Sequence, residues 1–424
     1  MSPTFASLSV RNYRWWAAGG FVSNVGTWMG RVAQDWLVLA VLTDHSATAL
    51  GIVTGLQFLP FLLLAPFAGA FVDRHDKRRI LLITQALLAV TSLLLGVLVV
   101  SGQATLWQVY ALALIQGLVT AVDNPARQAF VSEVVPQAVL ANAVSLNSAS
   151  FNAGRLIGPG TAGLLIAAFG TGPVLLANTA SFVFVLGALL GLDRSQLHPS
   201  GRPRGKGSVG EGLRYVRRRP DLLLVMFLVF VLGTFGMNYQ ITMALMATTV
   251  FDKGVSEYGL LGSVMAIGSL WGALLAARRN EPRLRTMLLA LCAFVVAAAG
   301  AALAPSYAVF AVLLVPVGLA SLTAMTTANS LVQTRVDPDM RGRVMALYMA
   351  VFAGGTPFGA PLIGWIGEAF GARWTIATGA ASVAISLAIV GVWLSRHQNV
   401  RVSYEFRRRP RLAVTTTPMV EVAK

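Results

Sequence analysis

Long apolar runs joined by short charged links constrain the fold of this chain more than any other feature. Residues 50–72 and 80–101 carry no charged side chain. The short link between these two runs holds Asp73, Arg74, Lys77, Arg78 and Arg79. A helix needs about 20 residues to cross about 30 Å of hydrocarbon. In lipid a helix satisfies its own backbone hydrogen bonds, and barrel strands are about half as long. The two runs therefore predict a pair of membrane-spanning helices.

The same alternation continues through all 424 residues and predicts an all-α membrane protein with twelve spans in two six-helix bundles. Residues 193–220, rich in Gly, Pro, Ser and Arg, form a predicted cytoplasmic linker between a first bundle at 1–192 and a second at 221–395. We expect a short surface helix near 213–216, and an unstructured basic tail at 396–424 with a lipid-binding patch at 407–409. The expected spans are 15–41, 50–72, 80–101, 106–121, 140–169, 174–192, 222–250, 258–277, 286–304, 307–331, 344–370 and 374–394.

Charged residues are few and unevenly placed. They make up 12% of the chain, against roughly 25% in soluble proteins. All of the 33 basic residues except Arg31, Arg155, Lys253 and Arg373 fall on one side of the predicted membrane. This bias predicts a multi-pass protein of the cell's inner membrane with both termini in the cytoplasm. It also explains the net charge of +16 as an orientation signal and a contact with anionic lipids, so we expect no nucleic-acid partner.

The two halves of the chain resemble each other around the fifth and eleventh spans. Each span follows a Val-x-Pro sequence, at 134–136 and 336–338, contains closely spaced Gly and Pro, and ends in Phe-Gly. A six-plus-six repeat is typical of secondary transporters, whose substrate site lies near the midplane between the repeats. The spans hold no Cys–His pair, metal-ligand spacing or carboxylate dyad, so we predict no enzyme activity, metal or cofactor.

The link between the second and third spans is similar to the corresponding loop of the major facilitator superfamily. The matching residues are Gly69, Asp73, Arg74, Lys77 and Arg78, with Asp76 where the family usually has Gly. The resemblance covers essentially all spans and implies a fold in which helices two and eleven pack at their cytoplasmic ends. It implies a gate in which Asp73 lies near Arg341 or Arg343, and Arg74 or Arg78 pairs with Asp123. The alternative is a solvated turn that only sets orientation.

The fifth span carries a second pattern, similar to the motif that marks exporters within the superfamily. Its residues are Gly154, Gly158, Pro159 and Gly163. With it, the chain resembles the bacterial drug and siderophore exporters of the enterobactin-exporter type, and the resemblance implies that this face seals the transport path. Close helix packing is the alternative interpretation. Neighbouring Arg155 is expected to reach the membrane surface or to pair with Asp123 or a lipid phosphate, not to bind substrate.

Asp35 is the only carboxylate well inside a predicted span, and Arg31 shares its helix face four residues earlier. Ala113 stands where the superfamily often has an arginine linked to proton transfer. Asp35, tuned by Arg31, is therefore the predicted proton-coupling site, and a structural ion pair is the alternative. One proton crossing 100 mV releases about 2.3 kcal/mol, which sustains a roughly 40-fold substrate gradient.

The first, fourth, seventh and tenth spans line the cavity in this superfamily, and here they combine aromatic, Met and amide side chains. Such side chains suit large amphipathic ligands, although some are expected to face lipid instead. We therefore predict proton-coupled export of drugs or siderophore-like metabolites by a monomer, with import or facilitated diffusion of a small metabolite as the alternative. The expected cavity residues are Asn24, Trp28, Gln34, Gln116, Phe235, Met237, Asn238, Tyr239, Gln240, Met243 and Asn329.

Overall fold

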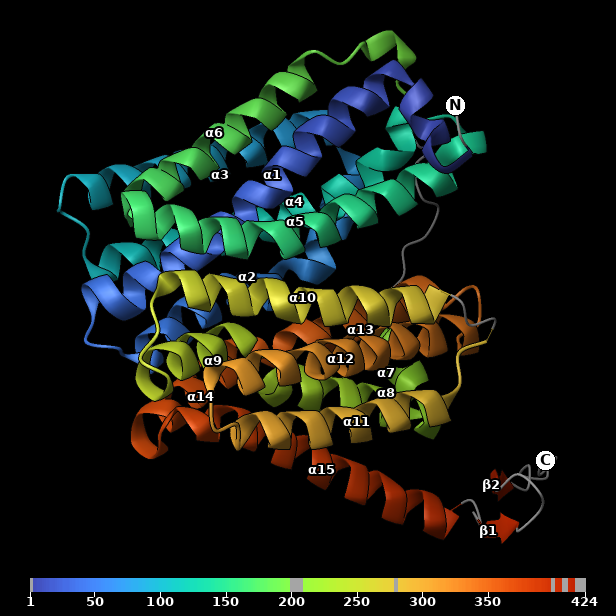
Figure 1. Cartoon of the computed structure of the whole chain (residues 1–424). Helices are drawn as coiled ribbons and strands as arrows, with labels where there is room; N and C mark the ends of the chain where they lie inside the picture. Colours follow the sequence, from blue (N-terminus) through green and yellow to red (C-terminus); the bar gives the residue numbers. More distant parts are fainter. Residues whose placement is uncertain (1–2, 199–208, 278–280, 398–400, 406–410, 416–424) are drawn as a thin grey trace.

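The computed structural model describes residues 3–198, 209–277, 281–397, 401–405 and 411–415, and the described chain is almost entirely helical. Two helical bundles lie side by side, the first drawn in blue to green and the second in light green through yellow to red (Figure 1). The first contains α1 (Arg11–Trp36), α2 (Ala47–Arg74), α3 (Lys77–Val100), α4 (Leu106–Val134), α5 (Leu140–Phe169) and α6 (Thr171–Leu190). The second contains α8 (Pro220–Val231), α9 (Tyr239–Leu245), α10 (Val255–Ala277), α11 (Leu284–Ala302), α12 (Tyr307–Arg335), α13 (Arg341–Gly354), α14 (Thr356–Phe370) and α15 (Ala372–His397).

Within the described residues, ten helical stretches are long and apolar enough to cross a membrane. Helices α1 and α5 are equally long but more polar. These two helices contact each other and contribute the polar side chains of the candidate site described below. The predicted all-α fold of two six-helix bundles is confirmed. Its two least apolar spans, α1 and α5, are those that carry the polar side chains of the candidate site.

Two of the predicted spans are interrupted helices. In the seventh, a π-helical turn at Leu232–Gly236 separates α8 from α9, and a second follows at Met246–Val250. The amide of Asn238 donates a hydrogen bond of 2.7 Å to the carbonyl of Thr234, one of the groups near the break. In the eleventh, α13 ends at Gly354, because Pro357 has no N–H to continue the backbone ladder. Interrupted helices near the midplane are common in transporters.

Short elements complete the described chain. A 3₁₀ segment at Pro3–Ser9 precedes α1, and two single turns lie at Gln137–Val139 and Arg194–Gln196. The surface helix expected before the second bundle is present as α7 (Val209–Arg217). The tail was predicted to lack structure, but its described part forms an antiparallel hairpin of β1 (Arg401–Glu405) and β2 (Arg411–Thr415). The predicted basic patch at 407–409 lies outside the described residues.

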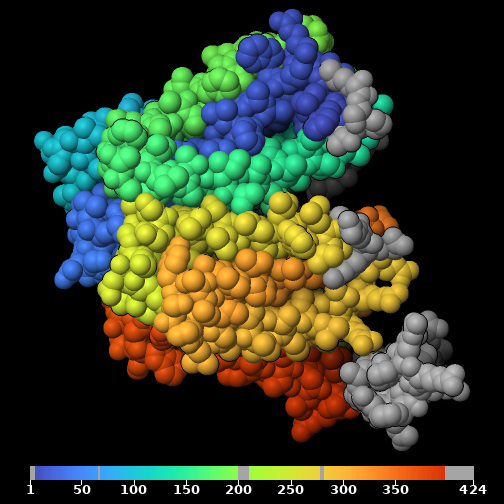
Figure 2. Space-filling model, viewed as in Figure 1, coloured from blue at the N-terminus to red at the C-terminus, as the bar shows by residue number. Residues whose placement is uncertain are grey.

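Both termini lie at one end of the bundles (Figure 1), which we call the terminal face; the opposite end is the distal face. Across the bundle interface, α2 packs on α14 and α5 packs on α10. Figure 2 shows the two bundles in contact toward the distal face and diverging toward the terminal face. The structure is therefore closed at the distal face and open at the terminal face.

Candidate functional site

The polar face of α1 is set by glycines on its opposite side. Gly26 and Gly30 lie against Ser181 and Asn178 of α6, where a methyl group would collide. Because a helix repeats every 3.6 residues, the opposite face carries a polar and aromatic row directed toward α5 and α10. The row contains Asn24, Trp28, Arg31 and Asp35.

Asp35 joins the two bundles. Its side chain is buried, and its Oδ2 accepts a hydrogen bond of 3.0 Å from the hydroxyl of Tyr258 on α10. Tyr258 is also buried, and its ring stacks on Trp36. Arg31 interacts with Asp35 electrostatically but forms no ion pair with it. The sequence predicted the Arg31–Asp35 face but not Tyr258, because nothing in the spacing of α1 indicates a partner more than 200 residues away.

Trp28 lies between two guanidinium groups. The Arg31 guanidinium is 5.2 Å from the centroid of the Trp28 ring, and that of Arg155 on α5 is 5.9 Å from it. Phe151 meets the same indole edge-on at 6.0 Å. The prediction that Arg155 reaches the membrane surface or pairs with Asp123 is wrong in this structure, because Arg155 faces α1 one turn from the glycines that pack there.

The remaining predicted cavity residues differ in their surroundings. The Asn24 amide donates to Ser150 Oγ at 3.0 Å, and Gln333 donates to Asn329. Tyr239 and Gln34 are buried, and the Tyr239 hydroxyl and the Gln34 amide nitrogen have no hydrogen-bond partner in the described chain. The other half-buried members are Trp28, Gln116, Phe235, Met237 and Gln240.

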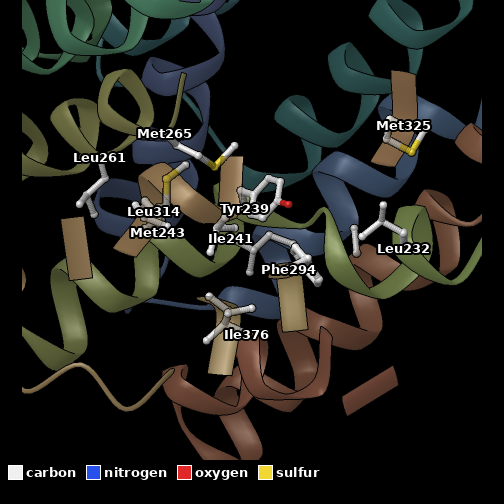
Figure 3. Close-up of a cluster of buried hydrophobic side chains, with 14 of the residues drawn as sticks. Leu232, Tyr239, Ile241, Met243, Leu261, Met265, Phe294, Leu314, Met325 and Ile376 are labelled. Carbon is white, nitrogen blue, oxygen red and sulfur yellow. The ribbon is translucent and has the colours of Figure 1, made fainter. Parts of the chain in front are cut away.

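Two predicted cavity residues are directed elsewhere in this conformation. Met243 packs in the buried apolar cluster of the second bundle with Met265 and Leu314 (Figure 3), and only 5% of its surface is exposed. It therefore contributes to the core, because α9 turns that face toward α10 and α12. Asn238 is likewise buried and bonded to its own helix.

The exporter motif of α5 divides between two neighbours. Gly154 and Gly158 face α1, where a methyl group would meet Asn24 and Trp28. Pro159 and Gly163 instead face α10 of the other bundle, where added side-chain atoms at Gly259 would collide with the Pro159 carbonyl. Different residues of one motif thus pack against a helix of the same bundle and against a helix of the other bundle.

Hydrogen bonds between described residues of the two bundles all lie in the distal half. Glu368, near the end of α14, accepts from the hydroxyls of Ser46 and Thr48 and from the Thr48 backbone N–H at 3.1 Å. Ser263 of α10 donates to the Leu156 carbonyl at 2.6 Å and accepts from the Gly160 N–H at 3.0 Å. The carboxylate of Glu368 thus sits at the N-terminus of α2, where a helix favours negative charge.

The predicted gate residues do not meet across the terminal face. Asp73, Arg74 and Arg341 are exposed and form no ion pair with another described residue, and Gly69 has open space beside it. Arg343 pairs with Glu211 of α7 at 2.9 Å. The Asp73–Arg343 contact is therefore absent in this open conformation.

Asp123 is also held within its own bundle. It accepts from Thr84 and Gln85, each at 2.7 Å, and pairs with Arg127 at 3.3 Å. Arg78 instead donates to the carbonyls of Leu189 and Leu190, which end α6. The predicted pairing of Asp123 with Arg74 or Arg78 is thus wrong for this conformation, because Arg127, one turn away, takes that position.

Comparisons with known proteins all lead to transporters. The family described as "Transmembrane secretion effector" matches residues 2–413. The staphyloferrin A transporter of Staphylococcus aureus is 25% identical over 370 residues, 84% of this chain and 90% of that protein. The multidrug efflux pump Tap of Mycolicibacterium fortuitum is 29% identical over 383 residues, 86% and 91% of the two chains. A bacterial homologue of the human lysosomal transporter Spinster, solved inward-facing and occupied, aligns with a TM-score of 0.69 at 17% identity over 93% of this chain and 98% of that one.

Proposed function

Because this chain belongs to the transmembrane secretion effector family of the major facilitator superfamily, we propose that it exports amphipathic small molecules in exchange for protons. The substrates are drugs or siderophore-like metabolites, as the names of its relatives suggest. The protein acts as a monomer in the inner membrane, with both termini in the cytoplasm and anionic lipids against its basic side. Import or facilitated diffusion of a small metabolite is the alternative.

The Asp35–Tyr258 hydrogen bond is the observation that carries this proposal. It connects a buried, titratable group of α1 to α10 of the other bundle. Opening of the distal face separates these helices, so the hydrogen bond must break when the carboxylate becomes accessible from that side. Gain or loss of a proton at Asp35 then changes the relative free energies of the two conformations, which is the requirement for coupling.

The charged groups that face Asp35 make this coupling chemically reasonable. Arg31 contributes a positive charge from the same helix, and Tyr258 contributes a neutral donor from the other bundle. In lipid, a carboxylate without such partners is strongly unfavourable. Asp35 can therefore be ionised in the closed distal arrangement and take up its proton when Tyr258 withdraws.

The gate follows from the same two conformations. With the terminal face open, Asp73 and Arg341 are exposed and form no ion pair with another described residue. We propose that closure of this face brings Asp73 to the start of α13, near Arg341 or Arg343, where charge-assisted contacts stabilise the outward-open form by about 1–3 kcal/mol each.

Everted membrane vesicles test the proton coupling. Respiration acidifies the vesicle interior and quenches an acridine dye, and we expect ethidium or erythromycin to restore fluorescence as protons leave in exchange. Asp35→Asn should abolish this response while the protein remains in the membrane. Asp44→Asn is the matched control, because Asp44 lies exposed in the link after α1. An unchanged response in Asp35→Asn would show that another group couples transport to protons, and no response of the unmodified protein to either compound would contradict multidrug export.

A further inference from the structure

Positive charge exceeds negative charge at the centre of the bundle interface. Arg31 and Arg155 both lie against Trp28, and they are close enough to each other to interact unfavourably. In the described chain, Asp35 is the only carboxylate that interacts with Arg31, and none interacts with Arg155. Neither guanidinium forms a hydrogen bond or ion pair with another described residue. Two such cations inside a membrane are unfavourable unless a partner of opposite charge binds.

A third donor lies beside this pair. The Tyr239 side chain is 7% exposed, and its hydroxyl has no hydrogen-bond partner in the described chain. Tyr239 is close enough to Arg155 to interact with it electrostatically. Figure 3 shows the Tyr239 ring at the apolar cluster of the second bundle, and the polar side chain near its hydroxyl is that of Ser321. A buried hydroxyl without a partner is uncommon in a native structure.

We propose that Arg31, Arg155 and Tyr239 form an anion subsite that binds a carboxylate group of the transported molecule. Guanidinium groups bind carboxylates through two parallel hydrogen bonds, and a phenol supplies a third donor. Trp28 and Phe151 lie beside the subsite and offer aromatic surface to the rest of the molecule. The substrate class is therefore an amphipathic organic anion, and this inference rests on the proposed transport function.

The charge of the substrate also favours export. A membrane potential that is negative inside drives an anion outward by roughly 40-fold per charge at 100 mV. Arg155 and Arg31 come from the first bundle and Tyr239 from the second. A carboxylate bound between them therefore contacts both bundles at once, as a substrate that alters their relative position must do.

Binding to purified protein tests the subsite without any transport assay. We would measure the thermal unfolding midpoint with citrate, phthalate or benzoate, each compared with sodium chloride at equal ionic strength. We expect at least one carboxylate to raise the midpoint specifically. Arg155→Gln and Arg31→Gln should each weaken the apparent affinity by tenfold or more, and Arg155→Lys should restore part of it because the charge remains but the planar fork does not.

Controls separate this inference from loss of folding and from the proposed function. Arg373→Gln removes an arginine that donates to the Ala302 carbonyl outside the site, and it should bind carboxylates as the unmodified protein does. If an arginine variant does not fold, Tyr239→Phe still tests the site with little change in packing, and we expect a several-fold loss. Equal midpoint shifts with chloride, or no carboxylate effect on the unmodified protein, would overturn the subsite. Retained binding in a protein without proton-coupled efflux would reject the proposed coupling alone.

Discussion

The distal and terminal halves of the bundle interface are built from different chemistry. In the distal half, backbones approach closely at glycines, and hydrogen bonds run from one bundle to the other. In the terminal half, the charged residues that form ion pairs in the described chain find their partners within their own bundle. Examples are Lys77 with Glu133, Asp123 with Arg127, and Arg343 with Glu211.

This difference explains how one face opens without loss of stability. Separation of the bundles at the terminal face breaks no ion pair between described residues, whereas separation at the distal face breaks the contacts of Glu368 and Asp35. Each bundle also keeps its own supports at the terminal face. Arg219, before α8, hydrogen-bonds Asp221, and this contact raises the pKa of the Arg219 guanidinium. Each bundle is thus held together at this face by contacts of its own.

The ion pair between Lys77 and Glu133 should have the largest effect on stability. The two side chains are only 8% and 12% exposed and lie 2.7 Å apart. Glu133→Gln leaves a buried ammonium without its carboxylate, which costs about 3–5 kcal/mol. We expect a clearly lower thermal unfolding midpoint in detergent. Glu211→Gln removes a pair that is 51% exposed on the carboxylate side, so it should cost about 1 kcal/mol or less. Equal losses would contradict the expected difference between the buried Lys77–Glu133 pair and the more exposed Arg343–Glu211 pair.

Substitution at the glycine contacts of the distal half should have the second-largest effect. Gly259→Val places side-chain atoms against the Pro159 carbonyl of the other bundle, and overpacking of this kind costs about 1–3 kcal/mol. We expect the distal face to open and transport to fall at least tenfold. Gly187→Val is the control, because nothing lies within reach of a methyl group there. Accessibility of a cysteine introduced at Ala47, in a Cys292→Ser background, measures the opening, and unchanged accessibility would reject the seal.

The apolar pattern determines most of this fold, because helix length and charge placement respond to the membrane and not to tertiary detail. The fifth span was predicted at 140–169, the range of α5. The fourth is predicted to end at 121 or to run on toward Pro125, but α4 continues to Val134. Hydropathy cannot show this, since the end of α4 is polar and is held by contacts such as that of Asp123 with Thr84.

Less of the candidate site than of the fold could be predicted from the sequence. The sequence indicates that Asp35 and Arg31 share a helix face, because both residues lie in one predicted span. Tyr258 and Glu368 derive their roles from partners in the other bundle, and no local pattern records such contacts. Arg155 was assigned to the membrane surface because an isolated arginine in an apolar run usually reaches it, and only the packing of α5 on α1 directs it to Trp28.

Glu368 offers a milder way to weaken the distal half. Its carboxylate accepts from Ser46 and Thr48 at the start of α2. Glu368→Gln keeps the size of the side chain but removes the charge at a helix N-terminus, which is worth about 0.3–2 kcal/mol. We expect a severalfold increase in distal opening, measured by the same cysteine labelling, with folding unaffected. Glu281→Gln, an exposed acid of the second bundle, should leave the labelling unchanged. If the cysteine is labelled as slowly in the Glu368 variant as in the protein with Glu368, the glycine contacts alone keep the distal face closed.

Substitution of Asp73 should have the smallest effect on the conformation described here. It tests the difference between the distal and terminal halves most directly, because Asp73 is expected to act only in the other conformation. Its side chain is exposed and has no ion-pair partner in the described chain, so Asp73→Asn should leave the unfolding midpoint unchanged. If Asp73 contacts α13 only when the terminal face closes, its loss disfavours that state by about 1 kcal/mol, or roughly fivefold in population. Transport should then decrease while labelling at the terminal face increases. Asp76→Asn keeps a capping side chain at the start of α3 and removes only the charge and the exposed ion pair with Arg79, so it should not reproduce this shift. Normal transport by Asp73→Asn would mean that the charged link only orients the protein in the membrane.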